Sequence, residues 1–131
     1  MKQITILTEA QGDIIAEVTE ALAHARVNIS SIAGEHYGRQ TVINVTVDNE
    51  TDALGALQNR QDWQVISEDA LLVRVDDEVG ALAILARRFS EARITLRSIR
   101  FVERHDGYAL VAIATDEPEK GRELLKNMLA G

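Results

Sequence analysis

One helix–strand segment occurs twice in this chain, at a constant spacing of 67 residues. The first copy spans residues 13–32 and the second spans residues 80–99, and five of the twenty aligned positions are identical. In both copies apolar residues recur at i, i+3, i+7 and i+10, as on one face of a helix, and then alternate as in a half-buried strand. The spacing extends to the strand before the helix, where Ile4 and Ile6 align with Leu71 and Val73. The repeat therefore predicts two copies of one small unit.

The first half of the chain has the pattern strand, helix, strand, strand, helix, strand. We expect these elements at residues 2–8, 13–26, 27–32, 41–47, 51–60 and 63–67, with a loop or hairpin end at residues 33–40. Asp13 is a suitable N-cap for the first helix, and Leu54 and Leu57 should face inward from the second. This order is the ferredoxin-like βαββαβ pattern, in which two helices cover one face of an antiparallel sheet.

The second half repeats this order but stops early. We expect strands at residues 70–75, 94–102 and 108–115, a turn at 76–79, a helix at 80–92, and a hairpin turn at 105–107. A last helix should begin near Pro118 and continue through Leu124, Leu125 and Met128. We expect no fourth strand, which would leave the first strand of this sheet as an uncovered edge that favours pairing with another chain. The sequence thus predicts an α+β chain with domains at residues 1–68 and 69–131, the second lacking its last strand.

Composition and charge narrow the function classes. The net charge of −7 disfavours nucleic acid and anionic membranes as partners of the whole surface. The absence of cysteine excludes disulfides and thiolate metal sites. Met1-Lys2 is followed directly by a short strand pattern, and the sequence has no long apolar run, so we expect neither a secretory signal nor a membrane span, and a cytoplasmic location. Units of about 65 residues are near the lower limit for a self-sufficient core, which favours association.

Each repeat carries the same signature, a turn with glycine, an aliphatic helix, and a strand of the form [VI]-N-I-x-S-[IL]. The first copy has Gly12-Asp13-Ile14-Ile15 and the strand VNISSI at residues 27–32, and the second has Gly80-Ala81-Leu82 and the strand ITLRSI at residues 94–99. This signature resembles the ACT domain. The resemblance implies two ferredoxin-like regulatory units that bind an amino acid or a similar small ligand, usually at interfaces between paired domains and beside the loop from first strand to first helix.

The chemistry of that loop supports a zwitterionic ligand. The first turn of a helix presents free N–H groups that can hold a carboxylate, and an aspartate or asparagine oxygen can accept from an ammonium group. The candidate ligand-binding residues are Gln11, Gly12, Asp13, Ile14, Asn28 and Ile29 in the first unit and Asp77, Glu78, Val79, Gly80, Ala81 and Thr95 in the second. The alternatives are that Asp13 is only a helix cap and that Asp77 and Glu78 form a solvated turn.

Both copies also depart from the family pattern. Neither has the proline that usually precedes the turn glycine, Asp13 stands where the family has its glycine, and Thr95 replaces the family's asparagine. One or both sites could therefore be silent.

Other site classes have weaker support. The three histidines are scattered, and the strand serines lack a nearby base, so we expect no metal, no cofactor and no catalytic residue. An arginine-rich stretch at residues 87–104 raises RNA binding as a possibility, but the aromatic spacing of an RNA-recognition sheet is missing. We interpret these arginines as a solvated or subunit-facing patch.

The predicted function is that of a non-catalytic, allosteric module that binds a small molecule, most simply an amino acid. It would act through ligand-dependent association of domains or subunits, as a homodimer or higher homo-oligomer, with a regulated enzyme as partner. The alternative from a different class is a structural or protein-interaction module that docks a partner enzyme without a ligand. RNA binding is the third and weakest hypothesis.

Overall fold

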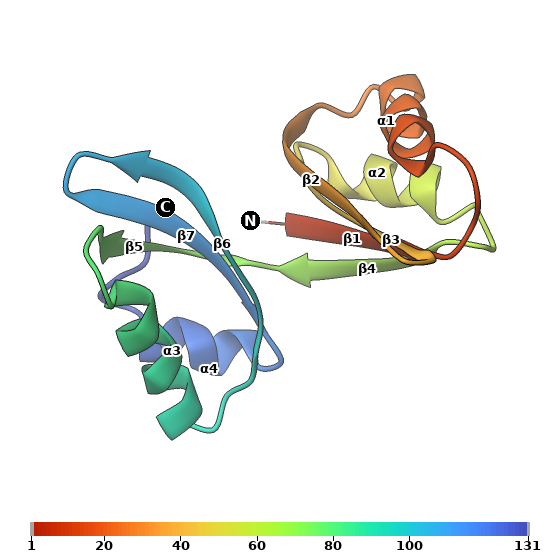
Figure 1. Ribbon diagram of the computed structural model, residues 1–131. Helices are drawn as coiled ribbons and strands as arrows, with labels where there is room; N and C mark the ends of the chain where they lie inside the picture. Colours follow the sequence, from red (N-terminus) through yellow and green to blue (C-terminus); the bar gives the residue numbers. More distant parts are fainter. Residues whose placement is uncertain (1, 131) are drawn as a thin grey trace. The chain divides into compact units, whose positions relative to one another are not determined.

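The computed structural model describes residues 2–130 and contains two compact units (Figure 1). The N-terminal unit comprises Lys2–Glu68, and the C-terminal unit begins at Asp69. Each unit has its own antiparallel sheet and its own hydrophobic core. The predicted α+β class and the repeated ferredoxin-like order are confirmed.

The N-terminal unit has the complete βαββαβ order. Its elements are β1 (Lys2–Thr8), α1 (Ile14–His24), β2 (Ile29–Tyr37), β3 (Gln40–Val47), α2 (Glu50–Leu57) and β4 (Gln64–Asp69). The strands lie in the order β2-β3-β1-β4. Alternation along β1 buries Ile4 and Ile6, and the apolar face of α1 buries Val18 and Leu22 against them, because each element directs one periodic set of side chains to the core.

The C-terminal unit repeats this architecture with three strands. Its elements are β5 (Leu71–Asp76), α3 (Ala81–Glu91), β6 (Leu96–His105), β7 (Tyr108–Thr115) and α4 (Pro118–Leu124). The sheet order is β5-β7-β6. Val73 and Val75 of β5 pack with Leu85 and Phe89 of α3 in a separate core.

The expected uncovered edge at β5 is wrong in part, because a short C-terminal segment lies along it. The Arg74 N–H donates to the Met128 carbonyl and the Ala130 N–H donates to the Leu72 carbonyl, each at 2.8 Å. A single antiparallel bridge joins Val73 and Leu129. Within residues 2–130, this segment takes the position next to β5 that β4 takes next to β1, without forming a strand.

Other expected boundaries also differ from the structure, including that of the strand expected at residues 94–102, which is β6 at Leu96–His105. Residues 33–37 are part of β2, because they pair in register with β3 up to Tyr37–Gln40, so the predicted loop is reduced to the turn at Gly38 and Arg39. The second helix ends at Leu57, and its buried residues are Ala53 and Leu57, whereas Leu54 is only partly buried.

The last helix ends at Leu124, short of the predicted end. The Lys126 and Met128 N–H groups then donate to carbonyls three residues earlier, and these tighter turns bring Leu129 onto β5.

Helices α1 and α3 end in the same way. Arg26 and Arg93 both adopt the left-handed conformation with φ of 59°. The Val27 N–H donates to the Leu22 carbonyl, and the Ile94 N–H donates to the Phe89 carbonyl, each at 2.9 Å. These bonds define a Schellman motif, whose left-handed position is usually glycine because a side chain there is strained. The repeat therefore keeps an arginine at a position where glycine is favoured.

Replacing Arg93 by glycine is expected to raise the free energy of unfolding by about 0.5–1 kcal/mol, because relief of left-handed strain exceeds the entropy that glycine gains in the unfolded chain. Urea unfolding followed by circular dichroism measures the change. The control is Arg87→Gly in the interior of α3, which should lower stability by about 1 kcal/mol. Equal losses of stability in Arg93→Gly and Arg87→Gly would show that the left-handed conformation of Arg93 is not strained.

Candidate ligand-binding pocket

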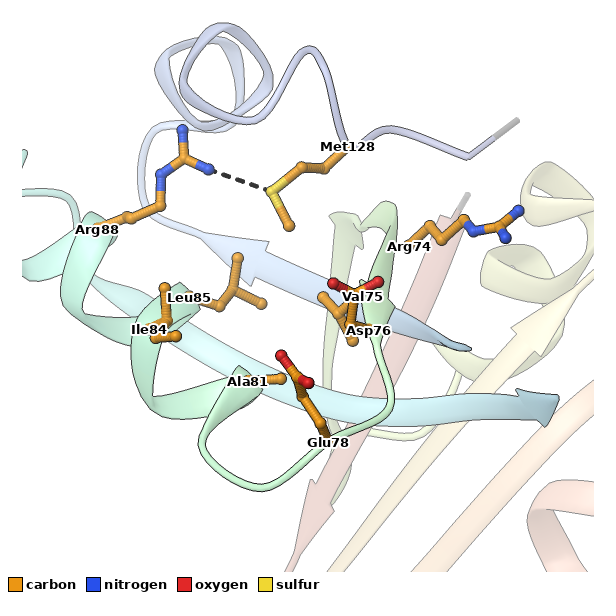
Figure 2. Close-up of a pocket in the computed structure, with 9 residues that line it drawn as sticks. All are labelled: Arg74, Val75, Asp76, Glu78, Ala81, Ile84, Leu85, Arg88 and Met128. Carbon is orange, nitrogen blue, oxygen red and sulfur yellow. Dashed lines mark hydrogen bonds between the residues drawn. The ribbon is translucent and has the colours of Figure 1, made fainter. Parts of the chain in front are cut away.

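A pocket of about 290 Å³ lies in the C-terminal unit beside the predicted ligand-binding turn (Figure 2). Its walls come from β5, the turn that follows it, α3, and the segment after α4. The lining residues are Arg74, Val75, Asp76, Glu78, Ala81, Ile84, Leu85, Arg88 and Met128. Of the predicted site residues, this pocket brings together Glu78 and Ala81.

The floor of the pocket is apolar. Val75 and Leu85 are 5 % and 1 % exposed, and they meet because β5 alternates and α3 turns one face toward the sheet. Ala81, Ile84, Leu85 and Arg88 follow at helical spacing and form one wall. Ile84 is largely exposed, so the pocket is open on that side.

One end of the pocket is acidic. Glu78 directs its carboxylate toward the space beside Ala81 (Figure 2). In the described part of the chain, the carboxylates of Asp76 and Glu78 have no hydrogen-bond or ion-pair partner. Two unpaired carboxylates beside an apolar floor form a suitable site for an ammonium group.

The turn that carries Glu78 also leaves the start of α3 uncapped. The Glu78 N–H donates to the Asp76 carbonyl at 3.0 Å, and the Ala81 N–H donates to the Glu78 carbonyl at 3.2 Å. Gly80, with φ of 89°, is the N-cap residue of α3 and offers no side chain to the first turn. In α1 the equivalent turn is capped, because Asp13 accepts from the Ala16 N–H at 3.4 Å. Amide groups in the first turn of α3 are therefore not occupied by a capping side chain.

The opposite end of the pocket carries Arg88. Its Nη2 donates to the Leu124 carbonyl at 2.9 Å, and its Nη1 donates to the Met128 Sδ at 3.2 Å. Arg74 also lines the pocket, but its guanidinium lies 3.7 Å from the centre of the Tyr108 ring and points away from the floor in Figure 2. Arg88 is therefore the cation that faces the pocket.

The matching positions of the N-terminal unit are filled differently. Ile14, only 3 % exposed, stands where the C-terminal unit has Ala81, and Ala21 stands in place of Arg88. Glu17 replaces Ile84 and pairs with Arg60 at 2.9 Å. The hydrogen bonds that Arg60 donates to the carboxylates of Glu17 and Asp62 raise the pKa of Arg60. The Ile14 side chain and the ion pair between Glu17 and Arg60 thus take the positions that line the pocket in the C-terminal unit.

The other predicted site residues of the N-terminal unit lie outside the pocket. Gln11 and Gly12 are exposed, Ile14 is in the core, and Ile29 is partly buried at the start of β2. The Asn28 main chain is held by Asp48, which accepts from the Asn28 N–H at 2.9 Å and donates its own N–H to the Asn28 carbonyl at 3.2 Å.

The remaining residues of the C-terminal unit are also outside it. Thr95 makes the same pair of bonds with Asp116, at 3.1 and 3.3 Å, and lines a separate hollow with Phe89 and Arg93. Asp77 lies 4.0 Å from Arg104, and Val79 is fully exposed.

Several pocket residues were missed by the sequence analysis. The repeat spacing that starts at Leu82 predicts only a buried helix face for Leu85, and the sequence places Arg88 in a basic patch and Met128 in a helix. The signal that could have found the pocket is the difference between the copies, since Ala81 aligns with Ile14 and Arg88 with Ala21.

Comparison with known proteins supports the fold. The chain matches no family model and no curated protein by sequence. Protein BT0572 from Bacteroides thetaiotaomicron has a similar structure, with a TM-score of 0.76, 23 % identity, and coverage of 98 % of this chain and 90 % of that one. The regulatory subunit of aspartate kinase from Thermus flavus has a TM-score of 0.64 at 20 % identity, with 95 % and 88 % covered. The chain has the fold of these regulatory subunits.

The ligand-free regulatory subunit of aspartate kinase from Thermus thermophilus agrees, with a TM-score of 0.62, 18 % identity, and 97 % and 91 % of the two chains covered. The resemblance to the ACT domain is thereby confirmed at the level of the fold. Among residues 2–130, no helix is long and apolar enough to cross a membrane.

Proposed function

We propose that this chain is a non-catalytic regulatory module that binds a free amino acid in the pocket of its C-terminal unit. The observation that carries the proposal is the distribution of charge around one apolar floor. Unpaired Asp76 and Glu78 lie at one end, and Arg88 lies at the other. Small-molecule sites are typically apolar hollows with a few placed polar groups, and a volume of about 290 Å³ suits a ligand of metabolite size.

Each part of an amino acid has a counterpart in the pocket. Glu78 and Asp76 would accept hydrogen bonds from the ammonium group, and the uncapped first turn of α3 would donate to the α-carboxylate. The side chain would then lie over Val75 and Leu85. In this proposal the N-terminal unit binds no ligand at its turn, because Ile14 takes the space that Ala81 leaves open.

The regulatory part of the proposal follows the fold. Solved structures of the same fold include regulatory subunits of aspartate kinase. A ligand that binds one arrangement of the chain stabilises that arrangement by mass action, and an associated enzyme could sense the change. We propose that the module works as a homo-oligomer in the cytoplasm with a regulated enzyme as partner.

Calorimetric titration with each of the twenty amino acids tests the proposal. Wild type should bind one or a few of them, and Glu78→Gln, which installs the residue of the matching position Gln11, should weaken binding about tenfold or more by loss of a charged acceptor. Glu119→Gln, an exposed change in α4, is the matched control and should leave affinity unchanged. Unaltered affinity in Glu78→Gln would contradict the assigned ammonium site.

One observation favours the second candidate function, a protein-interaction module. Ile99, Phe101 and Val102 on the edge strand β6 are 39–40 % exposed. Apolar side chains on a free strand edge are typical of a docking surface. Failure of all twenty amino acids to bind at millimolar concentration would favour this function over ligand sensing.

A further inference from the structure

The C-terminal segment, residues 125–130, forms a wall of the pocket and also covers the edge of β5. Met128 contributes its side chain to the pocket, while its carbonyl accepts from the Arg74 N–H at 2.8 Å. Among the described residues, one further main-chain bond, from the Ala130 N–H to the Leu72 carbonyl, joins this segment to β5. In the N-terminal unit the same position is held by β4, a strand of six residues. Leu125 anchors the start of the segment in the core, whereas residues 126–130 are exposed or only partly buried. This outer part, with two main-chain bonds to β5, can open locally.

Arg88 connects this segment to the pocket. Its guanidinium holds the Leu124 carbonyl, just before the segment, and the Met128 sulfur within it. A thioether is a weak acceptor, whereas a carboxylate forms charge-assisted bonds with a guanidinium that are about twice as strong as neutral ones. A ligand oxygen that reaches Arg88 would therefore replace the sulfur.

The length of the pocket decides which part of a ligand meets Arg88. Ala81 and Arg88 are seven residues apart on α3, which is about 10 Å along the helix axis. The α-amino and α-carboxylate groups share one carbon atom, so they cannot be held at both ends. When the α-groups lie beside Glu78 and Ala81, the end of the side chain points toward Arg88.

We infer, on the basis of the proposed function, that the ligand is an amino acid whose side chain ends in a carboxylate or amide oxygen. Its binding takes Arg88 from the C-terminal segment and releases residues 126–130 from β5, while Leu125 stays in the core. Release leaves the Leu72 carbonyl and the Arg74 N–H of β5 without their hydrogen-bond partners in the segment. An unpaired strand edge of this kind can accept another strand. Ligand binding and the state of the sheet edge are thus linked through one side chain.

The first arm of the test needs no ligand. Arg88→Ala installs the residue of the matching position Ala21. Amide hydrogen exchange at Arg74 and Ala130 should then speed up at least tenfold, because the hydrogen bonds from Arg88 to Leu124 and Met128 are lost. NMR of the full chain resolves these two amides. Arg87→Ala, one residue earlier on α3 and outside this pocket, should leave both rates unchanged. Unchanged exchange in Arg88→Ala would show that Arg88 does not hold the C-terminal segment on β5, whether or not any amino acid binds.

The second arm uses L-glutamate and L-glutamine, with L-norleucine as the apolar control. Wild type should bind one of the first two at least tenfold more tightly than norleucine, and that ligand should accelerate exchange at Arg74. Equal affinity for norleucine, or slower exchange with glutamate or glutamine bound, would overturn the inference. If another amino acid binds and these do not, the inference about ligand class fails while the proposed function stands. If none of the twenty binds, both fail, and the first arm still decides the role of Arg88.

Discussion

Replacing Phe89 by alanine is expected to lower the free energy of unfolding of the C-terminal unit by about 3–5 kcal/mol. Phe89 is 1 % exposed and packs in the core of that unit with Val73, Leu85 and Ile113. Its carbonyl also accepts the Ile94 N–H in the motif that ends α3. The variant leaves a cavity in a unit of about 60 residues, whose total stability is small, so much of this unit should unfold at room temperature.

The fluorescence of Trp63 reports on the unfolding of the N-terminal unit alone in this experiment. Trp63 is the only tryptophan of the chain, and it lies in the N-terminal core. In urea, Phe89→Ala should lose part of the far-ultraviolet circular dichroism early while the Trp63 fluorescence transition stays in place. Leu22→Ala, at the matching position of α1, should shift the fluorescence transition instead, with a loss of about 2–5 kcal/mol. A fluorescence shift of equal size in both variants would show that the units unfold as one.

The sequence repeat predicted the secondary structure closely because local patterns determine it. Helices α1 and α3 begin and end at positions exactly one repeat apart, at Ile14 and Ala81 and at His24 and Glu91. Apolar spacing defines the buried face of each helix, and the Schellman motif places each helix end at the same residue. Contacts within about one turn were therefore predictable from the sequence.

Contacts between distant residues were not predictable in the same way. The C-terminal segment was assigned to a helix, yet its main chain bonds to β5, more than fifty residues earlier. The outer part of β2 was assigned to a loop, because Gly34 and polar residues hide the strand pattern, although pairing with β3 continues to Tyr37. In both cases main-chain hydrogen bonds to a strand distant in the sequence determine the conformation, and no local sequence pattern indicates these bonds.

The pocket illustrates the same limit for function. The sequence predicts a ligand at the turn and names Glu78 and Ala81, which line the pocket, because turn chemistry is local. The sequence does not show that Arg88 lies at the opposite end of the pocket, since its position depends on the Leu124 carbonyl and on Met128, which the fold brings together. A small residue such as Ala81 gives no positive signal. Only its alignment with the bulky Ile14 shows that space is left open.

Replacing Ala81 by isoleucine is expected to abolish amino-acid binding, with a loss of affinity of at least about 100-fold, or ~2.7 kcal/mol. The new side chain would extend into the pocket beside Glu78 and Leu85 (Figure 2), and displacing these walls to admit a ligand costs about 1–3 kcal/mol or more. Isoleucine is already present at the matching position Ile14 at the start of α1, so α3 should tolerate it.

The matched control is the reverse change, Ile14→Ala. Ile14 belongs to the N-terminal core, so its removal should cost about 2–5 kcal/mol of stability and leave ligand affinity unchanged. Calorimetric titration gives the affinities and urea unfolding gives the stabilities of both variants. Together they separate two roles of one repeat position, a filled core in one unit and an open pocket in the other. Retained binding in a folded Ala81→Ile variant would place the ligand elsewhere, because a molecule of metabolite size and an isoleucine side chain would compete for the same space.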